Sequence, residues 1–99
     1  MTTTPDDLVT AYMFGFPLVF NLDQVTRYET TGVGKNPAAA WNTFSHARTL
    51  ADHNDTFVTI NNDTLYSMAQ LALSVGPILL SVPAPAARHF VLQFVSAWP

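Results

Sequence analysis

The chain contains no cysteine and few charged side chains. The absence of cysteine excludes disulfide bonds and thiolate chemistry, and it leaves the redox compartment unspecified. Charged residues make up 11% of the chain and hydrophobic residues 48%, whereas ordinary soluble domains carry ~25% charged residues. Such a chain can fill a core but has too few charges to cover a small globule. We therefore expect it to bury its surface against another element, or to be the front part of a longer protein.

Positive charge is limited to four side chains, and the net charge is −3. The four are scattered along the sequence as Arg27, Lys35, Arg48 and Arg88. Binding to phosphates along a nucleic acid needs a cluster of lysine and arginine. We therefore expect no nucleic-acid partner.

No hydrophobic run suits a membrane span or a signal peptide. Residues 11–20 form the longest apolar run, but Gly15 and Pro17 interrupt it. The run also has only half of the ~20 residues that a spanning helix needs. Asp6 and Asp7 stand where a signal peptide would carry basic residues. We therefore expect a cytoplasmic protein with no transmembrane segment.

The first part of the chain has the pattern of a helix. Thr4 and Pro5 suit the cap and the first position of a helix, and apolar residues follow at helical spacing as a core-facing stripe. Pro17 lacks an N–H group, so we expect a kink or break at residues 15–16. The helix should then resume over residues 19–28.

The remainder has the pattern of loops followed by strands, so the sequence predicts an α+β fold in a single, incomplete domain over residues 1–99. Residues 42–50 are compatible with either a strand or irregular structure. Loops or turns are predicted at residues 30–37, 38–41 (a short helical turn), 52–55, 76–77 and 83–86. Strands are predicted at residues 57–60, 65–74, 78–82 and 88–95. The last three have short connections and should form an antiparallel β-meander.

Residues 61–67 (Asn-Asn-Asp-Thr-Leu-Tyr-Ser) place a dense group of polar side chains directly before a predicted strand. Their oxygens could orient a polar ligand, with Asn61, Asn62, Asp63 and Tyr66 as candidate ligand-binding residues. Asn and Asp also accept hydrogen bonds from their own backbone in turns, so the same residues could hold a buried corner between two strands. Both interpretations stay open.

His46 and Arg48 form a second candidate pair, since residues two apart point the same way in an extended chain. Together they could bind an anion, with arginine as the hydrogen-bond donor. Alternatively, Arg48 could form a buried structural ion pair with Asp63. No metal site is predicted, because the calcium-loop spacing that begins at Asp52 has Phe57 where such a loop requires glycine. The sequence does not specify whether a cofactor binds or which one.

Four segments resemble the N-terminal part of the domain-of-unknown-function family 1254. Residues 11–19 resemble its aromatic-glycine-aromatic-proline helix, and residues 44–48 (Phe-Ser-His-Ala-Arg) match its Phe-x-His-x-Arg segment. Residues 61–67 match its most distinctive motif, and residues 82–93 follow its Val-Pro-x-x-x-x-Arg-Tyr-x-x-x-Gln pattern. The resemblance implies an α+β front end that continues into more of this domain and then a β-rich companion domain of family 1214. It implies a homo-oligomer as one option and no established reaction.

Two hypotheses for function follow. In the first, His46, Arg48, Asn62, Asp63 and Tyr66 line a pocket for a small polar or anionic ligand, completed by the rest of a longer chain. If the protein is an enzyme, His46 is the candidate general acid or base, Arg48 holds an anionic group, and Asp63 is the third catalytic candidate. In the second, the domain is structural and serves assembly, and the same residues form a buried hydrogen-bond network.

Overall fold

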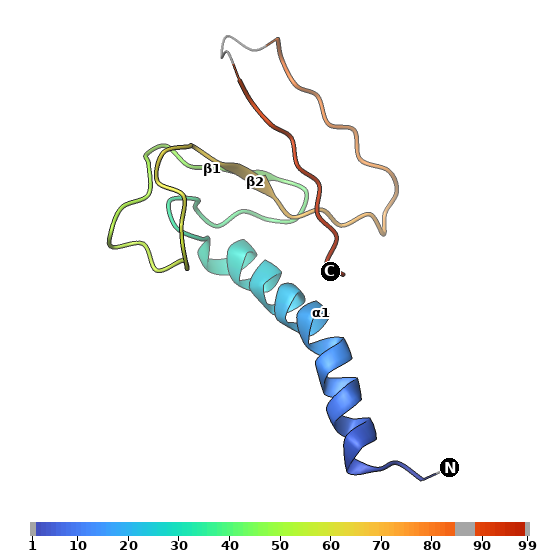
Figure 1. The fold of residues 1–99 in the computed structure, drawn as a ribbon. Helices are drawn as coiled ribbons and strands as arrows, with labels where there is room; N and C mark the ends of the chain where they lie inside the picture. Colours follow the sequence, from blue (N-terminus) through green and yellow to red (C-terminus); the bar gives the residue numbers. More distant parts are fainter. Residues whose placement is uncertain (1, 85–88, 99) are drawn as a thin grey trace.

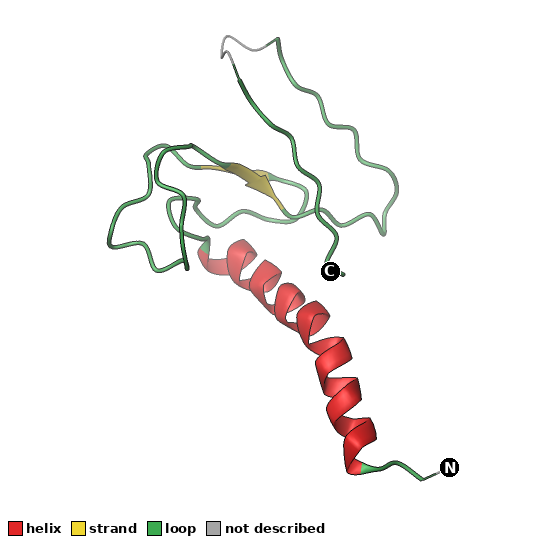
Figure 2. Ribbon diagram, in the orientation of Figure 1, coloured by secondary structure: helices red, strands yellow, loops and turns green. Residues whose placement is uncertain are grey.

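The computed structural model describes residues 2–84 and 89–98. It contains one long helix, α1 (Pro5–Thr31), and two short strands, β1 (Phe44–His46) and β2 (Ser67–Ala69), which pair antiparallel (Figures 1 and 2). The protein therefore combines a long N-terminal helix with a small antiparallel sheet. The predicted turn at residues 83–86 and the start of the predicted strand at Arg88 lie in part outside the described residues.

The start of α1 follows the local signals in the sequence. Thr4 is the N-cap: its Oγ1 accepts a hydrogen bond from the Asp7 N–H at 3.2 Å, and Asp7 Oδ2 accepts one from the Thr4 N–H at 2.9 Å. This reciprocal capping box satisfies backbone donors that the first helical turn leaves unpaired. The helix ends at Thr31, and its C-cap, Gly32, has a φ of 78° and donates its N–H to Tyr28 O at 3.1 Å. It thus runs three residues beyond the predicted end at residue 28.

Of the kink or break expected at residues 15–16, the break does not occur, because α1 continues through Pro17. Figure 1 shows a single helix that changes direction about midway along its length. The proline removes one backbone donor and leaves the carbonyl of Met13 without its usual partner. Because Met13 is exposed, water can take that donor's place, and the helix continues on both sides.

By length and composition alone, α1 could cross a membrane. Buried helices of soluble proteins and signal sequences share this property, so it does not identify the surroundings of the helix.

The sheet is smaller than the sequence predicts. Phe44 pairs with Ala69, Ser45 with Met68 and His46 with Ser67. Residues 42–50, which were open between strand and irregular structure, therefore supply β1, and the predicted strand at residues 65–74 is reduced to β2. No helical turn forms at residues 38–41; Trp41 and Asn42 instead lie in a turn, and Asn42 has a φ of 60°.

The predicted meander does not form within the described residues. Residues 78–82 and 89–95 belong to no strand there, and Figure 2 draws both segments as loops. Alternating apolar residues favour an extended backbone, but a strand also needs a neighbour for its N–H and C=O groups. Residues 57–60 form a bend and a turn instead of a strand, and Thr59 has a φ of 52°. That left-handed conformation is uncommon for a β-branched residue and is incompatible with a strand.

No hydrophobic side chain is buried within residues 2–84 and 89–98. The predicted core-facing stripe of α1 is open to solvent, with Tyr12 68% and Phe16 48% exposed. The radius of gyration is 17.4 Å, whereas a compact domain of this length has about 13 Å. The apolar content of the chain is therefore not used in a core of its own.

Candidate functional site

Among the described residues, the buried polar ones are Asn36 and Ser45, which join the turn after α1 to the sheet. Each is 8% exposed. Asn36 Nδ2 donates to Ser45 O at 3.0 Å and to Tyr66 O at 2.9 Å. Ser45 Oγ donates to Pro37 O at 2.6 Å. One side-chain amide therefore holds both strands of the sheet against the turn at residues 33–36.

The turn that carries Asn36 is itself closed by backbone hydrogen bonds. Val33 and Asn36 exchange N–H···O bonds of 2.9 Å in both directions. Gly34 has a φ of 53° and Gly32 a φ of 78°. A side chain at Gly32 would clash, because a Cβ there would lie 2.3 Å from Asn36 O. Glycine at position 32 is therefore required for the close approach that positions Asn36.

Strand pairing brings together the two candidate segments around His46 and residues 61–67. The Ala47 N–H donates to Tyr66 O at 3.0 Å. His46 Nδ1 and Ser67 Oγ lie 2.7 Å apart in a hydrogen bond, and the ring of His46 stacks on that of Phe44 with centroids 5.6 Å apart. The sequence places these segments about twenty residues apart, and the register of β1 and β2 makes them neighbours.

Within residues 61–67, two hydrogen bonds of the polar side chains stay inside the segment, one to its backbone and one between side chains. Asn61 Oδ1 accepts a hydrogen bond from the Asp63 N–H at 2.9 Å, which is the predicted turn chemistry of asparagine. Thr64 Oγ1 donates to Asp63 Oδ1 at 3.0 Å. Asn61, Asn62, Asp63 and Tyr66 are all exposed. The segment is therefore a solvent-exposed turn, not the buried corner that one interpretation expected.

Arg48 and Asp63 do not form the ion pair considered from the sequence. Both residues are exposed, and within residues 2–84 and 89–98 the ion pairs join Lys35 to Asp52 and to Asp55. The Asp63 carboxylate and the Arg48 guanidinium are therefore both open to solvent.

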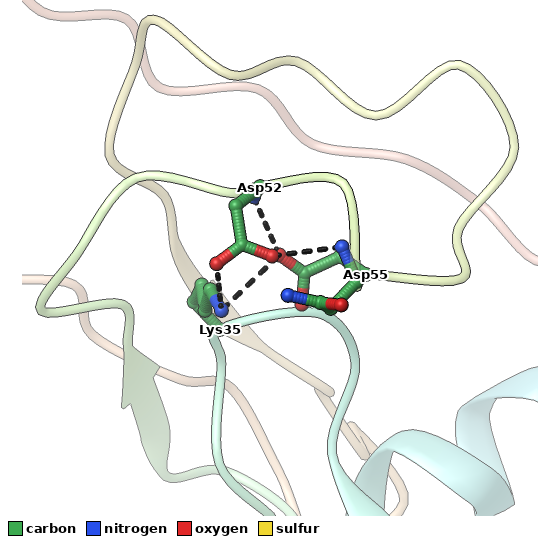
Figure 3. Close-up of polar contacts among 4 residues, drawn as sticks. Lys35, Asp52 and Asp55 are labelled. Carbon is green, nitrogen blue, oxygen red and sulfur yellow. Dashed lines mark hydrogen bonds and ion pairs between the residues drawn. The ribbon is translucent and has the colours of Figure 1, made fainter.

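Sequence reasoning missed the cluster of Lys35, Asp52 and Asp55. Figure 3 shows the Lys35 nitrogen facing both carboxylates; Lys35 Nζ lies 3.1 Å from Asp52 Oδ2 and 3.4 Å from Asp55 Oδ2. The predicted turn at residues 52–55 is confirmed, because the Asp55 N–H donates to Asp52 O at 3.1 Å and the Asn54 N–H donates to Asp52 Oδ1 at 2.8 Å. The two aspartates of the turn indicate that a positively charged partner would fit there, but the sequence does not reveal which lysine or arginine contacts them.

The cluster shifts the titration of two of its members. The hydrogen bond to Asp52 raises the pKa of Lys35, with a smaller contribution from Asp55. The Asn54 N–H lowers the pKa of Asp52, and Lys35 lowers it further. Lys35 is therefore held as a charged ammonium that is occupied by two carboxylates, which makes it a poor general base.

The hollow beside the buried Asn36–Ser45 network is too small for a ligand. The hollow lined by Asn36, Ser45 and Met68 has a volume of about 10 Å³, which is enough for at most one water molecule. No group of three or more histidine, aspartate or glutamate side chains in residues 2–84 and 89–98 is placed to hold a metal ion.

A family model described as "Protein of unknown function (DUF1254)" matches residues 41–99. The chain belongs to the DUF1254 family. The DUF1254 match contains β1, β2 and residues 61–67, whereas α1 precedes it. No curated protein and no solved structure matches the chain. The DUF1254 assignment therefore identifies the family to which the exposed polar segments belong, and it carries no reaction.

Proposed function

We propose that this chain is a structural part of a DUF1254 protein, and that the remainder of its own longer chain covers α1. The observation that supports this most is the absence of any buried hydrophobic side chain in residues 2–84 and 89–98, in a chain with 48% hydrophobic residues. Burying one valine, leucine or phenylalanine side chain stabilises a protein by about 1.5–3 kcal/mol. A surface with this many open apolar side chains is stabilised strongly by any fitting cover.

The surface in question is an aromatic stripe formed by Tyr12, Phe16 and Phe20 on α1. The ring centroids of Tyr12 and Phe16 lie 5.6 Å apart and those of Phe16 and Phe20 lie 5.8 Å apart. Successive members are four residues apart, so they follow one face of the helix. All three are exposed. A row of neighbouring aromatic rings supplies a continuous apolar contact surface for a second layer of protein.

One feature favours protein over lipid as this cover. Protein already lies on α1: Asn21 Nδ2 donates to Ala97 O at 2.8 Å, and the rings of Phe14 and Trp98 lie 5.5 Å apart. The C-terminal part of the described chain thus occupies one side of the helix.

Thiol accessibility in the intact protein tests this proposal. Phe16→Cys would be compared with Asp23→Cys, an exposed polar position on the same helix, after replacing any cysteine outside this chain with serine. We expect the cysteine at position 16 to react with a thiol reagent at least tenfold more slowly than the one at position 23. Equal rates would overturn the proposal. Protection that depends on protein concentration would point to a second copy, and protection that requires added lipid vesicles would point to a membrane; both would also overturn it.

A second candidate function is a site for a small polar or anionic ligand at the meeting point of β1 and residues 61–67. The observation that favours it is the strand pairing, which places His46 beside Ser67 and the Ala47 N–H on Tyr66 O. Arg48 follows His46 by two residues and Asp63 precedes Ser67 by four, and both are exposed. Further residues of a longer chain would have to complete a pocket around them.

Anion binding tests this second candidate. Titration of the intact protein with inorganic phosphate and with acetate would be followed by calorimetry. We expect Arg48→Gln to weaken binding at least tenfold and Arg27→Gln, a change at an exposed arginine on α1, to leave it unchanged. Equal affinities of the two variants, or no binding to the unaltered protein, would exclude an anion site at Arg48.

A further inference from the structure

Among the described residues, one serine hydroxyl lies against a histidine ring. His46 Nδ1 and Ser67 Oγ are 2.7 Å apart, and both residues are exposed. A serine within about 2.6–3.2 Å of a histidine nitrogen has the geometry in which the histidine can remove the hydroxyl proton. We propose that Ser67 is a nucleophilic serine, with His46 as its general base, that accepts acyl groups from esters.

The sheet fixes the relative position of the two side chains. Ala47 donates its N–H to Tyr66 O, so the adjacent cross-strand pair, His46 and Ser67, is the non-hydrogen-bonded one. Side chains of such pairs lie closer together than those of hydrogen-bonded pairs. The ring of His46 also stacks on Phe44, with an angle of 20° between the ring planes. Packing on one side and a hydrogen bond on the other restrict rotation of the imidazole.

The buried network holds this pair in place from the opposite side of the strands. Ser45 and Asn36 are buried, and Asn36 Nδ2 contacts the carbonyl oxygens of Ser45 and Tyr66. Ser45 and Tyr66 immediately precede His46 and Ser67 in the chain. The reacting groups therefore stand on backbone that is fixed by side-chain hydrogen bonds, although they themselves face solvent.

The other serines lack this arrangement. Ser45 is buried and donates to Pro37 O, and Ser96 Oγ accepts a hydrogen bond from the Trp98 N–H. Ser74 and Ser81 are exposed, and no histidine contacts either of them within residues 2–84 and 89–98. Ser67 is thus the serine whose hydroxyl has a base at hydrogen-bond distance, and Ser74 is a natural control.

The step that we propose is an acyl transfer. With the imidazole protonated on Nε2, Ser67 Oγ donates its proton to His46 Nδ1 while it forms a bond to the ester carbonyl carbon. The bond between that carbon and the alkoxy oxygen then breaks, and the proton on Nδ1 passes to the leaving alcohol. Ser67 is left as an acyl ester, and water releases the acid in a second step by the same proton transfers. No oxidant or metal is required.

This inference goes beyond the structural role proposed above, because it assigns a chemical reaction to the surface of the sheet. It uses the same region as the ligand-site candidate but does not depend on Arg48. A covalent adduct at Ser67 and a reversible anion complex are measured independently, so either can fail without the other.

Labelling with a fluorophosphonate tests the proposal. In this reagent Ser67 Oγ would bond to phosphorus, fluoride would leave, and His46 would take the proton. The intact protein would be incubated with the probe, digested, and the modified residue identified by mass spectrometry. We expect the adduct on Ser67, none in Ser67→Ala, and an unchanged rate in Ser74→Ala. Absence of an adduct on Ser67 would overturn the proposal, including the case in which other parts of the protein cover the pair.

The role of His46 needs its own variant. We expect His46→Gln, which keeps a hydrogen-bond acceptor but removes the base, to slow labelling at least 100-fold, within the range found for general bases. An unchanged rate would overturn the assignment of His46. Circular dichroism would establish that each variant is folded. If His46→Gln is not folded, Ser67→Cys provides a second measurement: its alkylation by iodoacetamide should be faster than that of Ser74→Cys by at least tenfold, and equal rates would refute the activation.

Discussion

Replacing Asn36 with alanine should loosen the sheet without touching any exposed polar group. The substitution removes two hydrogen bonds from Nδ2, to Ser45 O at 3.0 Å and to Tyr66 O at 2.9 Å. A net contribution of about 1 kcal/mol for each gives a loss of about 2 kcal/mol. The free energy needed to open the strand pair should fall by that amount. Because 1.4 kcal/mol corresponds to a factor of ten, the opening equilibrium should increase by about 30-fold.

Hydrogen exchange of the Ala47 amide measures this opening. Its N–H donates to Tyr66 O at 3.0 Å, so it exchanges only when the two strands separate locally. In the intact protein we expect the protection factor of this amide to fall by about 30-fold in Asn36→Ala. Asn36→Asp, which has nearly the same shape but no donor, should lower it at least as much.

Asn62→Ala is the matched control, because Asn62 is exposed and in the neighbouring motif. Substitutions at such surface positions usually change stability by less than about 0.5 kcal/mol. We therefore expect less than a threefold change at Ala47 in this control. A protection factor that stays within twofold in Asn36→Ala would show that the amide does not hold the strands, and it would refute the account of the buried network given above.

Two further predictions concern the charged groups. Lys35→Met should raise the pKa of Asp52 but leave it below the ordinary value, because the Asn54 N–H is the larger cause of the shift; NMR titration of the carboxyl group tests this, with Lys35→Arg as the control that keeps the charge. Thr4→Ala should remove the N-cap of α1 and destabilise the helix by about 1 kcal/mol. The hydrogen bonds from Thr4 lower the pKa of Asp7. The Asp7 carboxylate therefore stabilises the helix fully above its unfolded pKa, and this stabilisation is lost as the pH falls through its folded pKa. Circular dichroism that shows no such loss on acidification would contradict the capping box.

The sequence was sufficient where the signal is local. Thr4, Pro5 and Asp7 lie within one helical turn, and their residue types alone predict the helix start that the structure has. The turn of Asn61 on the Asp63 N–H is likewise a contact over two residues. In these cases no distant part of the chain affects the outcome.

The sequence was insufficient where the structure of a segment depends on a partner far along the chain. Residues 78–82 have the apolar composition of a strand but no strand neighbour in the described chain, so composition alone predicts too much. Asn36 reads as a loop residue, and its burial depends on two carbonyl groups from strands that follow later. Lys35 and Asp52 are 17 positions apart, and nothing in either local segment indicates their contact.

The same limit applies to the candidate site. The sequence identified His46 and the motif at residues 61–67, but it assigned no role to Ser67. The hydrogen bond between His46 and Ser67 follows from the register of β1 and β2, and a shift of one residue would place the two side chains on opposite faces of the sheet. Register is a property of pairing, which a single strand does not encode.

The open aromatic stripe of α1 also has a consequence for biosynthesis. α1 precedes β1 and β2 in the chain, so it leaves the ribosome before them with its apolar side chains uncovered. Translation proceeds at about 5–20 residues per second, so each further hundred residues add roughly 5–20 s before the proposed cover, made of later sequence, can arrive. During that interval the helix is a target for chaperones that bind exposed hydrophobic segments, and the cellular yield of the protein should depend on them more than its final stability does.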